Sequence, residues 1–141
     1  MGINPDEFIA LVEEGLPQTQ GARLKAEDWQ PGSIRLVMPI DHRHGRPGGT
    51  VAGPTLFALA DLALYGAVLS RIGRVELAVT TSMTINFLRK PALTDVAAEA
   101  KLLKLGKRLA YGEVHLYSIG TDDPIAHVTG TYSIPPKDPM R

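Results

Sequence analysis

Asp61 is the residue whose position most clearly indicates chemistry. In the stretch 47–70 it is the only ionisable acid or base apart from the Tyr65 phenol. Moving an unpaired carboxylate out of water costs several kcal/mol. We therefore expect Asp61 to have either a polar partner or a function. The plain structural alternative is an aspartate bonded to a nearby hydroxyl or backbone group.

The loop before Asp61 is rich in glycine and positive charge, reading HRHGRPGGTVAGP over 42–54. Gly53 lies at a predicted helix start, where its N–H lacks a partner within the helix and sits at the positive end of the helix dipole. That position suits an oxyanion. Pro54 has no N–H, so Gly53 is the only donor of the pair. The alternative is an ordinary glycine–proline helix start.

Hydrophobic periodicity and turn residues predict two helices and six strands. Asn4 and Glu7 form a capping-box pattern at the start of a helix over 5–15. A helix over 54–71 is apolar around nearly its whole circumference, which is typical of a buried helix. The strands are expected at 24–29, 34–40, 77–87, 96–102, 109–119 and 125–134, a loop at 41–52, and a frayed tail at 135–141.

The predicted strand 77–87 has two different faces. Thr81 and Met83 lie on the apolar face, whereas Thr80 and Ser82 lie on a small, hydroxyl-rich face. A hydroxyl at Thr80 can orient water for Asp61. The alternative is an ordinary strand threonine at a seam between subunits.

These elements predict an α+β fold in one domain covering 1–141. Four consecutive strands predict an antiparallel meander, and the apolar helix needs to be wrapped. A curved antiparallel sheet around the central helix, with the N-terminal helix beside it, satisfies both needs. Because one helix cannot cover about six strands, we expect dimerisation.

Composition excludes several classes of protein. Lys+Arg and Asp+Glu are both 15, and zero net charge disfavours nucleic-acid and membrane-surface binders. There is no cysteine, and His42 and His44 have no third ligand at a helpful spacing, so we predict no metal site. His115 and His127 are expected to be exposed or to have hydrogen-bond partners.

The chain start does not resemble a signal peptide. The stretch 54–70 is too short to span a membrane and carries the charged Asp61, so we expect a cytoplasmic protein.

Two motifs resemble the hotdog-fold thioesterases of the phenylacetate-degradation (PaaI) type. They are AGPTLFALAD over 52–61 and VTTSMTINFLRKP over 79–91, and the resemblance extends over 34–134. The sequence departs from the family pattern at three positions. Ala52 replaces the family histidine, Pro54 replaces a second glycine, and Arg46 replaces a common asparagine.

The resemblance implies a hotdog fold and hydrolysis of acyl-CoA thioesters at a site between two subunits of a homodimer or homotetramer. Asp61 would be the general base or nucleophile, the Gly53 N–H would hold the thioester carbonyl, and Thr80 would position water. No cofactor is expected, because coenzyme A is part of the substrate.

Substrate-binding residues are expected in two groups. The phosphates of coenzyme A suit basic side chains at strand ends and turns, although such residues are also common as solvated turns. An acyl pocket suits apolar residues near Asp61, although these are also common as plain core. The basic candidates are Arg46, Arg89, Lys90, Lys107 and Arg108, the apolar candidates are Leu56, Phe57, Tyr65 and Met83, and Thr81 completes the set.

Two other functions remain open. The missing histidine at Ala52 is compatible with a non-catalytic protein that binds acyl-CoA or another ligand. A hotdog hydratase or dehydratase is less favoured, because these enzymes typically pair a histidine with an acid and 53–71 contains no histidine.

Overall fold

The computed structural model describes residues 2–16, 19 and 21–136. Its elements follow the predicted order, with an extra small hairpin in the loop before the central helix. Residues 137–141 of the predicted tail lie outside the described residues. The elements are α1 (Pro5–Gly15), β1 (Lys25–Gln30), β2 (Ser33–Met38), the 3-10 helix η2 (His42–His44), β3 (Gly45–Arg46), β4 (Thr50–Val51), α2 (Gly53–Ile72), β5 (Val79–Phe87), β6 (Val96–Leu105), β7 (Leu109–Ser118) and β8 (Ala126–Ser133).

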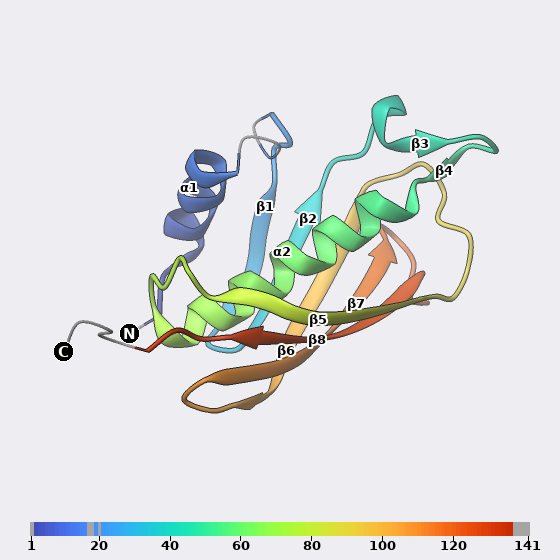
Figure 1. Cartoon of the computed structure of the whole chain (residues 1–141). Helices are drawn as coiled ribbons and strands as arrows, with labels where there is room; N and C mark the ends of the chain where they lie inside the picture. The colour runs from blue at the N-terminus through green and yellow to red at the C-terminus, as the bar shows by residue number, and fades with distance from the viewer. Residues whose placement is uncertain (1, 17–18, 20, 137–141) are drawn as a thin grey trace.

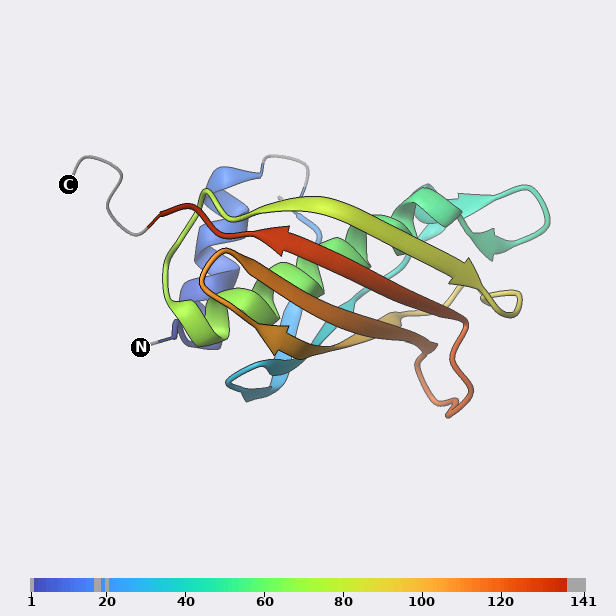
Figure 2. The same ribbon diagram turned by 60° about the horizontal axis from the view of Figure 1, so that its bottom comes forward.

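One curved antiparallel sheet of six strands wraps around α2, as Figures 1 and 2 show. The strand order is β1-β2-β6-β7-β8-β5. Helix α1 packs beside β1, and the β3–β4 hairpin lies at the N-terminal end of α2 (Figure 1). The α+β hotdog prediction is therefore confirmed.

The central helix packs very closely against the middle of the sheet. Gly112 and Gly130 face each other across β7 and β8. A Cβ atom at Gly112 would lie 2.7 Å from a methyl carbon of Leu64 in α2, and one at Gly130 would lie 2.8 Å from another. A side chain at either position would lie closer to Leu64 and to the neighbouring strands than van der Waals contact allows, so these glycines permit the close approach of α2 to the sheet.

Helix α1 is fixed at both its start and its apolar face. The Asn4 side chain accepts a hydrogen bond from the Glu7 N–H at 2.8 Å, and the Glu7 carboxylate accepts one from the Asn4 N–H at 2.9 Å. This is the predicted capping box. Buried Phe8 lies between the rings of Trp29 and Tyr65, with centroids 5.5 and 6.0 Å away, and thereby joins α1 to β1 and α2.

The predicted four-strand meander is wrong for its first strand. Only β6, β7 and β8 form a meander, whereas β5 pairs with β8 at the edge of the sheet. The reason is that β2 already occupies the free edge of β6, pairing Ser33–Met38 with Val96–Lys101. The connection 88–95 is long enough to carry the chain to the other side.

The predicted uninterrupted alternation of 77–87 is also wrong. The pairing of β5 with β8 shifts between Thr80 and Ser82, which is a β-bulge. The bulge reverses the phase, so Thr80 before it and Met83 after it both lie toward α2. Leu77 and Val79, predicted to share the apolar face with Met83, are instead exposed. Phe87 stays in phase with Met83 through the pairing with β8, and it is exposed beside Gly53 at the end of the strand.

Helix α2 is long and apolar enough, by length and composition alone, to cross a membrane. However, 56% of its most apolar window is buried within the protein. Packing against the sheet therefore accounts for much of the apolarity of α2, as expected for a core helix.

Candidate active site

Asp61 is held by two hydroxyl groups through one of its two oxygens. The Thr80 hydroxyl donates to Oδ1 at 2.7 Å, and the Tyr132 hydroxyl donates to the same atom at 2.7 Å. Tyr132 also donates to the backbone oxygen of Asp61 at 3.1 Å. Within the described part of the chain, no group donates to Oδ2. The carboxylate is thus oriented through Oδ1, and Oδ2 is available for a water or a carbonyl carbon.

Tyr132 is the buried partner of this arrangement. It lies on β8, only 3% exposed, and its ring stacks on Tyr65 with centroids 5.9 Å apart. Burial and the nearby charge of Asp61 raise the pKa of the Tyr132 phenol. Tyr132 therefore remains a hydrogen-bond donor to Asp61 at any ordinary pH.

A cavity of about 330 Å³ opens beside Asp61. Its walls come from the C-terminal part of α1, the middle of α2 and the start of β5, and they are mainly apolar. A partly enclosed apolar cavity next to a carboxylate can hold an acyl group while keeping bulk water away. The lining residues are Leu11, Val12, Gly15, Leu16, Asp61, Leu62, Tyr65, Glu76, Ala78, Val79, Thr80 and Tyr132.

Gly53 forms the first turn of α2, as the sequence predicts. Within the described residues its N–H has no hydrogen-bond partner, and the preceding Ala52 caps the helix without a side-chain bond. A Cβ atom at Gly53 would lie 3.3 Å from the Phe87 ring, so the site is narrow. A free N–H at a helix start is a ready donor for a negatively charged oxygen.

A second cavity, of about 560 Å³, surrounds Gly53. Three cations line it, namely Arg46, Arg89 and Lys90, and its lining contains no acidic residue among those that the structure describes. Arg89 donates a hydrogen bond to the backbone oxygen of Pro124 at 3.1 Å, which helps hold its guanidinium. This cavity is therefore suited to an anion.

Asp61 and Gly53 are too far apart to act on one carbonyl group within one chain. They are eight residues apart on α2 and therefore about 12 Å apart along its axis. Reacting atoms need to approach to about 3–3.5 Å. The two residues also line different cavities. The structure thus brings Thr80 to Asp61, and Arg46, Arg89 and Lys90 to Gly53.

The apolar candidates occupy different places. Tyr65 lines the Asp61 cavity. Leu56 is 1% exposed and belongs to the core, although it also borders the cavity around Gly53. Phe57 is 39% exposed on α2 and lines neither cavity, and Met83 packs against the core.

The remaining polar candidates do not join either cavity. The Thr81 hydroxyl donates to the backbone oxygen of Thr131 at 3.2 Å. Lys107 and Arg108 form the β6–β7 turn, at the end of the sheet where β5 begins, whereas Arg89 and Lys90 follow the end of β5. The length of β5 separates these two pairs of cations by roughly 27 Å.

His44 lies beside the position where the family histidine was expected. Its backbone oxygen accepts a hydrogen bond from the Ala52 N–H at 2.8 Å. Its ring Nδ1 accepts one from the Asp41 N–H at 3.0 Å, which ties the imidazole to its own loop. His42 is exposed.

Sequence reasoning missed Tyr132. Its signal is present but weak: Ala126, Val128, Gly130 and Tyr132 form the inward row of β8, and Tyr132 is the only one with a polar tip. Its pairing with Thr80 across β5 and β8 places it beside Asp61. That pairing is a long-range contact that periodicity does not reveal.

The fold and this site together define a hotdog thioesterase. The chain belongs to the thioesterase superfamily, whose family model matches residues 48–125, more than half of the chain. This match supports thioester hydrolysis as the general class of reaction.

Individual proteins agree with this assignment. A candidate thioesterase from Silicibacter sp. TM1040 is 46% identical, with 95% of this chain and 93% of that chain aligned and a TM-score of 0.85. A single-substitution variant of the phenylacetic acid degradation protein PaaI from Thermus thermophilus is 28% identical, with 84% and 99% aligned and a TM-score of 0.74. A candidate esterase from Saccharolobus solfataricus is 27% identical over 111 residues, which are 79% of this chain and 73% of that protein.

Proposed function

We propose that the protein hydrolyses acyl-CoA thioesters at a site completed by two copies of the chain. Asp61 of one copy would serve as general base or nucleophile, and the Gly53 N–H of the other would hold the carbonyl oxygen. The observation that carries the proposal is the arrangement of Asp61, whose Oδ1 is fixed by Thr80 and Tyr132 while Oδ2 accepts no hydrogen bond from the described residues.

Two chemical routes are compatible with an available Oδ2. In the first, Oδ2 removes a proton from water as the water oxygen bonds to the carbonyl carbon. The carbon–sulfur bond then breaks, and the departing sulfur takes that proton back from the Asp61 carboxyl and leaves as the thiol. In the second, Oδ2 itself bonds to the carbonyl carbon and the sulfur leaves as a thiolate. Water then hydrolyses the resulting anhydride to the free acid and the Asp61 carboxylate, and one proton of that water passes to the thiolate. In both routes the oxygen of the carbonyl gains negative charge, which the Gly53 N–H would stabilise.

The proposal gives Thr80 a somewhat different role from the expected one. Its hydroxyl proton is directed to Asp61 Oδ1 rather than to a water. Thr80 and Tyr132 together would hold the carboxylate plane in place, and the Thr80 oxygen can still accept a hydrogen bond from the attacking water.

The cationic cavity around Gly53 supports coenzyme A as the leaving group. Arg46, Arg89 and Lys90 would meet its phosphates, and Arg46 adds a charge where the family commonly has a neutral asparagine. The nearby Gly53 N–H would then receive the thioester at the end of the same ligand. No separate cofactor is part of this proposal.

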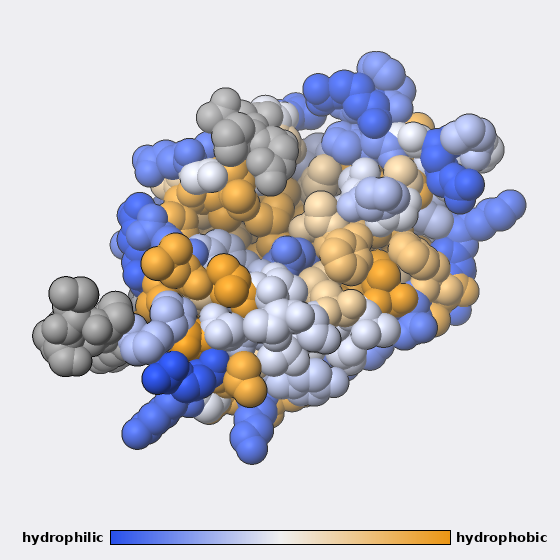
Figure 3. All heavy atoms as spheres, viewed as in Figure 1, coloured by the Kyte–Doolittle hydropathy of each residue, from blue (hydrophilic) through white to orange (hydrophobic). Residues whose placement is uncertain are grey.

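A two-chain site also explains the exposed apolar surface. Apolar side chains gather along the face that contains α2 in Figure 3, and Pro54, Phe57, Ala58 and Leu62 flank Asp61 on the less buried side of the helix. The edge strand β5 also exposes Val79 and Phe87. A homodimer or homotetramer would cover these residues, and the cytoplasm remains the proposed location.

Non-catalytic binding of acyl-CoA is the alternative with a specific observation behind it. Ala52 supplies no side-chain hydrogen bond at the start of α2, and the His44 ring is bonded within its own loop. In that case the cationic cavity would bind the ligand without turnover.

Release of free thiol from a panel of acyl-CoAs tests the proposal. We expect Asp61→Asn to lower kcat for the best substrate by about 10²–10⁴-fold, because an amide cannot accept the proton or attack the carbonyl. Binding should change little. Wild-type turnover in Asp61→Asn would eliminate the mechanism, and saturable binding without turnover in both proteins would establish the non-catalytic alternative.

A further inference from the structure

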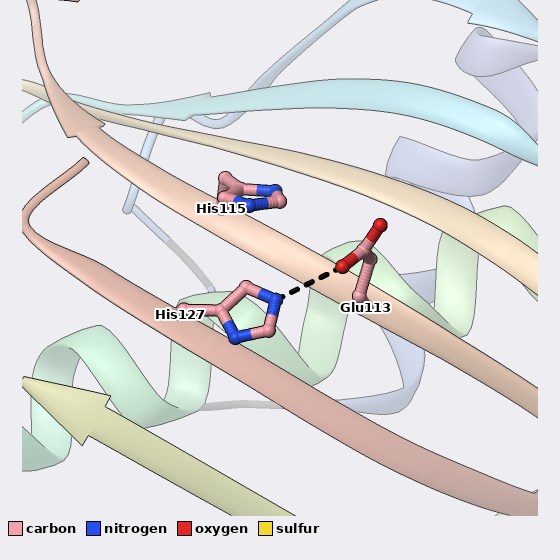
Figure 4. A group of neighbouring side chains, drawn as sticks. All are labelled: Glu113, His115 and His127. Carbon is pink, nitrogen blue, oxygen red and sulfur yellow. Dashed lines mark hydrogen bonds and ion pairs between the residues drawn. The ribbon is translucent and has the colours of Figure 1, made fainter. Parts of the chain in front are cut away.

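The outer face of the sheet carries a second group of side chains suited to chemistry, namely Glu113, His115 and His127 (Figure 4). Residues of β7 and β8 alternate between the two faces of the sheet. Val114 and Val128 are fully buried on the side of α2, so these three residues lie on the opposite side. The whole sheet therefore separates them from Asp61.

The backbone fixes the spacing of these three residues. His115 and His127 are directly opposite each other in the antiparallel pairing of β7 and β8, and Glu113 lies two residues before His115 on the same face. The imidazole centroids are 4.6 Å apart. His127 Nε2 lies 2.9 Å from Glu113 Oε1, and one potential ligand atom from each residue lies within 4.8 Å of the others.

This group has the composition of a zinc site with one open position. Zn²⁺ binds imidazole nitrogen at about 2.0–2.1 Å and carboxylate oxygen at similar distances, and two histidines with one glutamate is an established ligand set. Tetrahedral ligand atoms at those bond lengths are roughly 3.3 Å apart. Side-chain rotations alone can close the present spacing to that value, because the three backbone positions are already adjacent.

Beside this group lie one positive charge, which would repel a metal ion, and one acidic residue that is already ion-paired. Lys101 of β6 is paired opposite Glu113, and Glu99 is paired opposite His115 but is bonded to Arg35 at 2.7 Å. Neither supplies a free ligand.

We propose that Glu113, His115 and His127 bind one Zn²⁺ ion. The ion would join β7 to β8 and leave its fourth position to solvent. Because α2 and Asp61 lie across the sheet, this site would stabilise the fold rather than take part in hydrolysis. The sequence prediction of no metal site rested on linear spacing, and the two histidines are brought together only by the pairing of β7 with β8.

The chain offers a clear test, because it contains four histidines and no cysteine. Tag-free full-length protein would be treated with a chelator and titrated with Zn²⁺ by calorimetry. We expect one ion per chain and a Tm that rises with Zn²⁺ concentration. His115→Ala and His127→Ala should each weaken binding by more than about 100-fold, which exceeds the loss of an outer-shell partner. The exposed loop variant His42→Ala should bind like the wild type.

His127→Gln serves as a second variant, because it keeps a hydrogen-bonding side chain beside Glu113 but removes the imidazole. The Tm without metal shows whether each variant is folded. Absence of saturable Zn²⁺ binding by the wild type would overturn the proposal. So would equal binding by folded His127→Gln, or loss of binding in His42→Ala alone.

Discussion

The start and the middle of α2 hold opposite kinds of charge. At the start, a Gly53 N–H without a partner among the described residues and three nearby cations form a cavity for negative charge. In the middle, Asp61 holds a negative charge beside an apolar cavity. About 12 Å of helix separates them. Under the proposed function, each chain would carry two half-sites, one that binds and one that reacts, and a second chain would complete each.

Among changes to the binding half-site, we expect removal of the Gly53 N–H to have the largest effect on the rate. Gly53→Pro lacks the donor but suits the first helical position, and the extended Ala52 before it is compatible with a following proline. The restriction that Pro54 places on a side chain at position 53 applies to proline and to an alanine control alike. We expect kcat to fall by about 10²–10³-fold, as when other oxyanion donors are removed. Steady-state release of thiol measures this.

Gly53→Ala is the matched control. It keeps the N–H and adds the same Cβ atom near Phe87, so it isolates the steric effect. If the two variants were equally active or equally impaired, the N–H would have no special role and the comparison between the two half-sites would fail.

Tyr132→Phe tests how the reactive half-site is positioned. The variant keeps the ring but loses one of the two hydroxyls on Asp61 Oδ1, and a hydrogen bond to a charged group contributes about 1.5–3 kcal/mol. We expect kcat to fall by about 10- to 100-fold. Thr80→Ser, which retains its hydroxyl, should remain close to the wild type.

The pH dependence of this variant gives a second check. Because the pKa of Tyr132 is raised, it keeps its proton past the ordinary value of about 10. The ratio of wild-type to Tyr132→Phe rates should therefore stay constant from about pH 7 to pH 10. A ratio that falls toward one across this range would show that Tyr132 loses its proton there.

Arg89→Ala should have a smaller effect, confined to binding. Losing one phosphate contact should raise KM about tenfold while kcat changes little. Lys107→Ala, at the other end of β5, is the control variant whose KM is compared with that of Arg89→Ala. An equal rise in KM for both would mean that the cavity around Gly53 is not the main phosphate site of the complete enzyme.

Much of the fold was predictable because its signals are local. The capping box at Asn4 and the largely apolar central helix each depend on neighbouring residues in the chain, and both helices appear where predicted. The edge position of β5 was not predictable, because it follows from β2 occupying the side of β6, a contact between distant segments.

The site residues also divide into those with a local sequence signal and those placed by long-range contacts. Asp61 stands out because it is the only acidic residue in an apolar helix, and Gly53 because it begins that helix. Tyr132 is an ordinary tyrosine in a strand, and only the pairing of β5 with β8 brings it to Asp61. The bulge after Thr80 is likewise invisible in the sequence, yet it places Thr80 and Met83 on the same side.

Complementation between two inactive variants tests the two-chain site most directly. Asp61→Asn and Gly53→Pro subunits would be mixed by co-expression and the thiol release of the mixture measured. In a two-fold dimer, each mixed pair has one site with both Asp61 and Gly53 intact, so an equal mixture should recover about a quarter of the wild-type rate. Activity no greater than that of the separate variants would contradict a site shared between two chains.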